Sequence, residues 1–252
     1  MRTPGARGWG FSKAAIGFRS EFLDFARGIR VGNLEPHERI TRILKAGLEA
    51  RYGQEFVTER WGRGVYWQWI GFLVRANRAA KPLSSGVSFG CSKLFITVDG
   101  EDGFFKCGLQ IERGFVRAPA DFRECRLRSD WDWHRLVKGV TPRGALMAEV
   151  RRLVGEEGFR LQAGSWGAPH VFEGEPPTAR ALQAALADGA ARDWCAFQLY
   201  YGQTEQDIRG TSGTDLVEMM MAVFDEVTPA MNLCSQVSIG GSVPVRPQCG
   251  TF

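Results

Sequence analysis

The sequence predicts an α+β fold, in which an antiparallel sheet with a central two-faced buried strand and a β-hairpin is packed by several helices. Three observations lead to this prediction. Residues 64–75 are apolar on both faces, residues 94–111 alternate about a DGEDG turn, and several other segments carry apolar residues at helical spacing. Strands and helices do not alternate regularly, so a parallel sheet is not expected.

No long linker rich in Gly, Ser or Pro interrupts the middle of the chain. We therefore expect residues 1–252 to form a single α+β domain. The end of the chain is rich in Ser, Gly and Pro, which predicts a flexible C-terminal tail from about residue 232.

Two helices are predicted before the sheet. The first covers residues 12–28, where Phe18, Phe22 and Phe25 recur at four- and three-residue spacing. The second covers residues 35–52, with a proline in its first turn and a glycine after its end. Its buried stripe consists of Ile40, Ile43, Leu44 and Leu48.

The β-hairpin has a predicted register, because matching its two apolar faces leaves one way to pair the arms. The expected pairs are Val98 with Phe105, Ile96 with Cys107, and Leu94 with Leu109. Residues 100–103 then form a four-residue turn. In that register Cys91 falls opposite Glu112, so a disulfide between Cys91 and Cys107 is excluded.

The second half of the chain mixes helices and strands. In order, we predict a helix opened by Thr141 and Pro142, short strands in FRLQAG and WGAPHVFEG, a helix over 178–191, a strand over 194–202, and a helix over 214–228 that ends before Pro229. The expected buried stripe of the first of these helices is Leu146, Val150, Leu153 and Val154, and that of the second is Leu182, Ala185 and Leu186.

Six cysteines, at positions 91, 107, 125, 195, 234 and 249, are too few and too scattered to brace a chain of this length. Free thiols in a reducing compartment are therefore expected. No apolar run reaches the roughly 18 residues of a spanning helix, and the N-terminus lacks the pattern of a secretory signal. We expect a cytoplasmic protein with no membrane association.

Charge is distributed unevenly along the chain. Residues 1–152 hold 27 Lys and Arg against 16 Asp and Glu, and residues 153–252 hold 5 against 12. Such asymmetry can mark a surface for nucleic acid, although an acidic segment can also neutralise a basic one within the fold. Only six of the 32 basic residues are lysine, which suggests a bacterial source with a GC-rich genome.

Aromatic and basic residues are interleaved between positions 60 and 78, which is how proteins hold single-stranded nucleic acid. The opposing interpretation is that a strand apolar on both faces belongs to the core. The candidate nucleic-acid-binding residues are Arg39, Arg42, Lys45, Arg60, Arg63, Arg75 and Arg78.

The sequence contains no complete motif for catalysis or metal binding. The three histidines are far apart, and neither a phosphate-binding glycine loop nor a GxSxG elbow is present. Asp99 and Asp102 precede Glu112, as in some metal-dependent nucleases, but the lysine expected two residues after Gln110 or Glu112 is missing. We predict no catalytic residues, no metal and no cofactor, although dispersed residues such as Asp99, Glu112 and His134 could still assemble a site.

Two further segments have two interpretations each. Trp131, Trp133 and His134 would form a partner-binding loop if exposed, because exposed tryptophan is common at hot spots, or the indoles could cover the fold. The run Met219–Met221 is either an adaptable docking face or helix core.

The leading functional hypothesis is a non-catalytic binding or accessory protein that contributes a rigid surface to a larger bacterial assembly through a protein partner. One alternative is a nucleic-acid-binding or nucleic-acid-processing protein that uses the basic region 1–152. The other is an enzyme with a dispersed acidic site, so whether the chain is an enzyme stays open.

Overall fold

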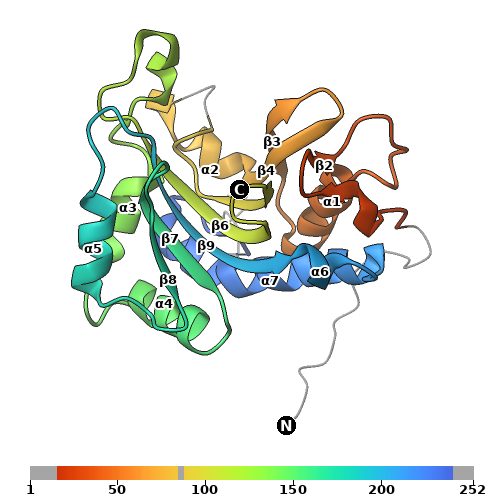
Figure 1. Ribbon diagram of the computed structural model, residues 1–252. Coiled ribbons are helices and arrows are strands. Elements are labelled where there is room, and N and C mark those ends of the chain that lie inside the picture. The colour runs from red at the N-terminus through yellow and green to blue at the C-terminus, as the bar shows by residue number, and fades with distance from the viewer. Residues whose placement is uncertain (1–15, 85–87, 241–252) are drawn as a thin grey trace, which may run out of the picture.

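The computed structural model describes residues 16–84 and 88–240, which form an α+β fold around one large antiparallel sheet (Figure 1). Its strands lie in the order β1-β2-β4-β5-β6-β9-β7-β8, and β3 pairs with β4. The strands are β1 (Leu23–Asp24), β2 (Gly28–Arg30), β3 (Phe56–Arg63), β4 (Tyr66–Val74), β5 (Lys93–Asp99), β6 (Phe104–Gly114), β7 (Arg160–Ser165), β8 (His170–Glu173) and β9 (Cys195–Thr204). The predicted fold class is confirmed.

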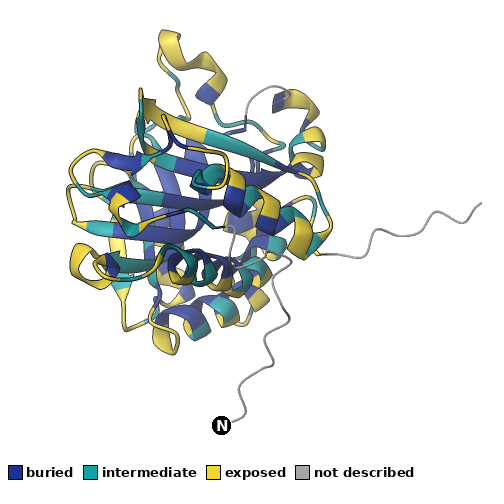
Figure 2. Cartoon of the chain, turned by 90° about the vertical axis from the view of Figure 1, so that its right-hand side faces the viewer, coloured by how far each residue is buried: buried dark blue, intermediate teal, exposed yellow. Residues whose placement is uncertain are grey.

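Helices cover one face of this sheet. The longest, α7, lies against β6 and β9 and contacts α1, α3 and α4, while α5 packs on β7 and β9. The helices bury one side and expose the other (Figure 2). The α-helices are α1 (Ile40–Tyr52), α2 (Arg75–Ala79), α3 (Asp132–Gly139), α4 (Ala145–Gly155), α5 (Ala179–Ala187), α6 (Glu205–Ile208) and α7 (Gly213–Cys234), and the 3-10 helices are η2 (Ser20–Phe22), η3 (Pro82–Ser84) and η4 (Ala120–Cys125).

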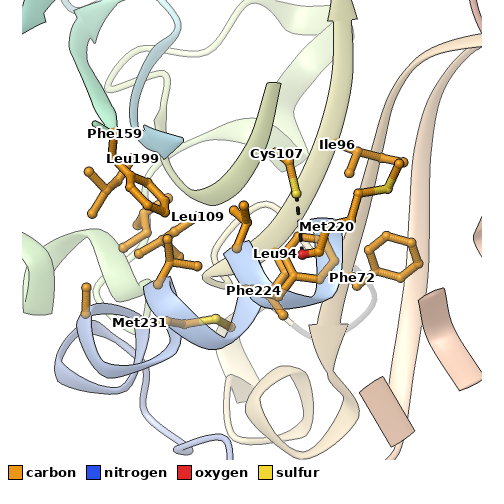
Figure 3. Packing of buried hydrophobic residues seen from close by; sticks show 14 of the residues in the cluster. Phe72, Leu94, Ile96, Cys107, Leu109, Phe159, Leu199, Met220, Phe224 and Met231 are labelled. Carbon is orange, nitrogen blue, oxygen red and sulfur yellow. Dashed lines mark hydrogen bonds between the residues drawn. The ribbon is translucent and has the colours of Figure 1, made fainter. Parts of the chain in front are cut away.

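The core lies between α7 and the sheet (Figure 3). The thiol of Cys107 on β6 lies 3.7 Å from the carbonyl oxygen of Met220 on α7 and donates to it. The rings of Phe72 on β4 and Phe224 on α7 meet edge to face, with centroids 6.2 Å apart. Because strand side chains alternate between the two faces, every second residue of β4, β5 and β6 contributes to this apolar layer.

The hairpin register is confirmed. Val98 lies opposite Phe105, Ile96 opposite Cys107, and Leu94 opposite Leu109. The predicted strand is central, since β4 pairs with β3 on one side and with β2 and β5 on the other, but only its residues 70–74 are buried as predicted. The strand β3 itself is not predicted by the sequence, because its apolar residues do not alternate.

The first predicted helix is wrong over its described part. Residues 20–22 make one 3-10 turn, and β1 and β2 then form a small hairpin. The carboxylate of Asp24 accepts hydrogen bonds from the backbone N–H groups of Ala26 and Arg27, at 3.0 and 2.9 Å, and closes the turn between these strands. Phe18 and Phe22 are nevertheless buried, so their spacing indicated burial and not a helix. Residues 12–15 lie outside the described residues.

Two other helices begin later than predicted. Turns precede α1, which starts at Ile40, four residues after Pro36, and ends at Tyr52, where Gly53 adopts a left-handed φ of 64°. The helix α4 starts at Ala145, because a turn closed by the Gly144 N–H and the Thr141 carbonyl occupies residues 141–144. The buried stripes of both helices are as predicted.

The prediction that Pro229 ends the last helix is wrong, because α7 continues to Cys234. A proline inside a helix costs about 3 kcal/mol. The residues after it offset this cost by burial, since Ala230, Met231 and Cys234 are all 0% exposed.

The C-terminal tail also begins later than residue 232. Asn232 bonds through its side chain to the backbone N–H and carbonyl of Ile239, at 2.6 and 2.9 Å, and Ile239 is buried. Residues 241–252 of the predicted tail lie outside the described residues.

A buried polar cluster joins the ends of several elements. The carboxylate of Asp132 at the start of α3 accepts hydrogen bonds from Lys81 at 2.7 Å, Asn77 at 2.9 Å and the backbone N–H of Ser92 at 2.7 Å. Asn77 in turn accepts from the backbone of residues 236 and 237, each at 3.2 Å. The three side chains are at most 1% exposed, so their mutual bonds replace those with water.

We predict that Leu109→Ala and Ile70→Ala each lower the free energy of unfolding by about 2–5 kcal/mol, because both residues are fully buried on the apolar face of the sheet. Urea denaturation measures the change. Glu101→Ala in the exposed hairpin turn is the control and should change stability by less than about 0.5 kcal/mol. A surface-like response of either core variant would contradict the sheet described above.

Candidate binding surface on the β3–β4 hairpin

The sheet face opposite α7 carries a buried polar network. Gln110 on β6 and Gln198 on β9 lie directly opposite each other. The side-chain oxygen of Gln110 accepts hydrogen bonds from Gln198 at 2.7 Å and from the indole of Trp69 at 3.0 Å. Its amide nitrogen donates to Glu112 at 3.1 Å. The network therefore holds the ring of Trp69 in a fixed position on this face.

A buried ion pair completes the network. The ammonium of Lys93 donates to the second carboxylate oxygen of Glu112, and the two side chains are 1% and 8% exposed. The same ammonium lies 5.8 Å from the ring centroids of Trp69 and Phe89. Both oxygens of Glu112 are thus engaged, which is the condition under which a buried charge is tolerated.

The hairpin surface is the exposed turn end of the β3–β4 hairpin. We define it as Arg60, Trp61, Arg63, Tyr66 and Trp67, together with Arg27 and Arg30 beside them. Trp61 lies opposite Trp69 in the β3–β4 register, so the two indoles start from the same face of the sheet. Whereas Trp69 is bonded to the network, Trp61 is 70% exposed. A rigid scaffold therefore presents an indole to solvent.

Arginines stack on the aromatic rings of this surface. The guanidinium carbon of Arg60 lies 3.8 Å from the centroid of the Trp67 ring, and that of Arg27 lies 4.4 Å from the Tyr66 ring. Such stacking leaves the N–H donors on the edge of the Arg60 guanidinium free for a ligand, whereas Nε of Arg27 donates to Asp24.

The positive charge of the hairpin surface is only partly neutralised. Arg27 pairs with Asp24 at 2.6 Å. Within residues 16–84 and 88–240, Arg30, Arg60 and Arg63 form no ion pair with a carboxylate. A partner that supplies anionic groups would complete their pairing.

The seven basic residues predicted to bind nucleic acid do not form one patch. Arg60 and Arg63 lie near the turn of the β3–β4 hairpin, whereas Arg75 and Arg78 lie in α2, beyond its other end. Arg75 lies beside Glu55, so five strand residues, or about 16 Å at about 3.3 Å per residue, separate it from Arg60, and Arg63 is farther away. Arg75 also pairs with Glu55 at 2.8 Å.

Of the other three predicted residues, Arg39 directly precedes α1, and Arg42 and Lys45 lie on it. Arg39 donates to the carbonyl of Leu34 at 2.7 Å, and Lys45 pairs with Glu49 at 3.6 Å. Arg42 is exposed. They are therefore part of a helix surface, and the structure adds Arg27 and Arg30 to the hairpin instead. The sequence missed these two because they fall in or just after the wrongly predicted first helix.

Of the two interpretations of the Trp131–His134 segment, the structure supports the one in which the indoles cover the fold, so Trp131 and Trp133 do not form an exposed partner-binding loop. Trp131 is 1% exposed and Trp133 is 4% exposed, and the Trp131 indole donates to the hydroxyl of Ser84 at 2.8 Å. Asp132 between them is held in the buried cluster, so the segment is turned inward. His134 is exposed. Met220 and Met221 are buried as helix core.

The structure does not bring the three dispersed acid–base candidates together. Asp99 pairs with Lys106 at the turn of the β5–β6 hairpin, Glu112 pairs with Lys93 near the far end of β6, and His134 bonds to the carbonyl of Arg128. In the described part of the chain, no three His, Cys, Asp or Glu side chains are placed to hold a metal ion.

The five described cysteines are free and buried. Burial raises the pKa of their thiols, to about 11 for Cys91 and Cys125. Such thiols are protonated at neutral pH and are poor nucleophiles. Cys249 lies outside the described residues.

The fold and the hairpin surface together define an α+β protein in which the sheet face opposite α7 supports an exposed aromatic and basic hairpin. Comparison with protein-family models, curated proteins and solved structures finds no match for the chain. Among the helices of the described residues, none combines the length and apolar character needed to cross a membrane.

We predict an acid-sensitive contribution to stability from the Asp99–Lys106 pair. Burial alone would raise the pKa of Asp99, but the hydrogen bond and charge of Lys106, 2.8 Å away, outweigh it and hold that pKa below its ordinary 3.8. A carboxyl whose pKa is lowered by folding stabilises the protein above its unfolded pKa and loses that contribution as the pH falls through the folded value.

Urea denaturation at a series of pH values should therefore show that Asp99→Asn loses less stability than the wild type as the pH falls below 3.8. The exposed Asp121 provides the control variant, Asp121→Asn, which should follow the wild-type profile. Parallel acid profiles for the wild type and Asp99→Asn would show that the pair does not act in this way.

We also predict that all six cysteines are reduced in the native protein. Thiol counting in denaturant without reductant should give six, because the five described thiols are buried and unpaired. A count of four or fewer would reveal a disulfide and contradict the expected reducing compartment.

Proposed function

We propose that the chain is a non-catalytic binding or accessory protein that presents the hairpin surface to a macromolecular partner in a larger assembly. The observation that carries this proposal is the 70% exposure of Trp61 on a hairpin whose opposite indole, Trp69, is locked by buried hydrogen bonds. Large aromatic side chains on a rigid scaffold bind with a small loss of conformational freedom.

The buried network supports a binding role over a catalytic one. Its principal polar groups bond to one another, and the carboxylate of Glu112 accepts from both Lys93 and Gln110. A general acid or base must instead reach a substrate. The separation of Asp99, Glu112 and His134 points in the same direction.

We place this function in the cytoplasm of a bacterium. The unpaired, buried thiols support a reducing compartment, and the arginine excess supports the source. Two kinds of partner suit an aromatic and basic hairpin: a protein, which the sequence favours, and a single-stranded nucleic acid.

We predict that Trp61→Ala removes the partner recovered by affinity isolation of the full chain from its native organism, because the indole is the exposed anchor of the surface. Quantitative mass spectrometry and nucleic-acid staining of the eluate measure the recovery. Trp166→Ala is the matched control, since Trp166, like Trp61, exposes its indole to solvent. Trp166 lies at the turn between β7 and β8, at the other end of the strand order.

Equal recovery with the wild type and both variants would contradict a function of the hairpin surface. Circular dichroism and thermal unfolding should show that Trp61→Ala is folded, because an exposed side chain contributes little to stability.

A further inference from the structure

Resting on the proposed function, we propose that the partner of the hairpin surface is a single-stranded nucleic acid, with its phosphates at Arg60 and Arg63 and a base stacked on Trp61. The sequence alone favoured a protein partner because β4 looked like core on both faces. The structure divides that strand: residues 70–74 are buried, whereas residues 66–69 are half-buried or exposed.

The unpaired arginines of the hairpin surface suit a ligand with phosphate groups. Arg60 and Arg63 form no ion pair with a carboxylate in the described part of the chain, and the guanidinium carbon of Arg60 lies over the ring of Trp67, 3.8 Å from its centroid. A guanidinium stacked in this way can direct its edge donors to two phosphate oxygens. Neutralising backbone phosphates releases counterions, which drives binding without reading sequence.

The exposed indole of Trp61 suits a ligand with open base faces. Trp61 and Arg63 are two residues apart on β3 and lie on the same face of the hairpin, whereas Arg60, opposite the core residue Ile70, lies on the other face over Trp67. The exposed indole therefore has one guanidinium beside it and a second across the edge of the strand. Successive bases of a single strand can stack on such a ring while the neighbouring phosphates meet the arginines. A register shift between Trp61 and Gly62 bulges the hairpin here, and a Cβ at Gly62 would come within 2.6 Å of Trp67 Cα. The bulge therefore needs glycine, and the absence of a side chain at this position leaves space beside the indole.

Both features together select a single strand. An acidic protein segment would neutralise the arginines but offers no regular set of planar groups to Trp61. A duplex would offer phosphates, but its bases are stacked inside and closed to the indole. A single strand alone supplies phosphates and open base faces at short, regular spacing.

The test is fluorescence anisotropy of the full chain with labelled oligothymidylate and oligouridylate of about 20 nucleotides, which exceeds the site size of most single-strand grooves. We expect binding that weakens as salt rises. Trp61→Ala should weaken it roughly 5- to 150-fold, corresponding to the loss of one stacked base. Trp61→Phe should retain most of the affinity because it keeps an aromatic face.

Charge reversal tests the phosphate contacts. Arg60→Glu combined with Arg63→Glu should abolish binding at micromolar protein, and Arg60→Gln with Arg63→Gln should make the slope of log K against log salt shallower by about 1.4, at about 0.7 per single-strand phosphate contact. Arg135→Glu with Lys138→Glu, on exposed positions of α3 at the opposite side of the fold (Figure 1), makes the same charge change as a control and should leave most of the affinity.

Three outcomes would overturn the inference: no salt-sensitive binding of either oligonucleotide, equally tight binding of duplex of the same length, or equal competition by polyglutamate. If the Trp61-dependent partner of the isolation experiment survives nuclease treatment, the inference fails while the proposed function stands. If nothing recovered depends on Trp61, the proposed function itself fails.

Discussion

Side chains alternate between the two faces of the sheet along each strand, so the sheet has one apolar face and one face that carries buried polar groups. The rest of the structure follows from that division. On β6, Cys107 and Leu109 face α7, whereas Gln110 and Glu112 face the other way. The first face is buried by apolar contacts with helices (Figure 3). On the second face Gln110 and Glu112 are also buried, so their polar groups must satisfy one another.

That requirement links the middle of the sheet to its exposed edge. Lys93 needs Glu112, Glu112 accepts from Gln110, and Gln110 accepts from Trp69. A chain of buried bonds of this kind is costly to break at any point, since each remaining group would lose its partner. Trp69 is therefore fixed, and the adjoining strand β3 presents Trp61 from a support that does not need to be ordered by a ligand.

A second polar cluster has a different effect. Asp132 draws Lys81, Asn77 and the start of β5 to one point, and so anchors α3 against the sheet and the segment after α7. Trp131 and Trp133 flank this carboxylate and are carried inward with it. Trp131 and Trp133 thus stabilise the fold, whereas Trp61 is presented to solvent.

The sequence by itself determined the hairpin of β5 and β6 and its register, because a period of two and a turn of fixed length leave a single pairing that buries every apolar side chain. It likewise determined the stripes of α1, α4 and α5, whose apolar spacing is set within each helix.

Only the tertiary structure decided the remainder. Phe18 and Phe22 have helical spacing, but pairing with β4 and the turn at Asp24 draw their segment into the sheet. Pro229 is tolerated because the turn after it is buried by other elements. Trp131 and Trp133 face inward because Asp132 between them bonds to Lys81, a partner 51 residues earlier in the sequence. The exposure of Trp61 likewise depends on strands that pair only when the chain folds. Local periodicity cannot report these outcomes, since each is fixed by a partner distant in the sequence.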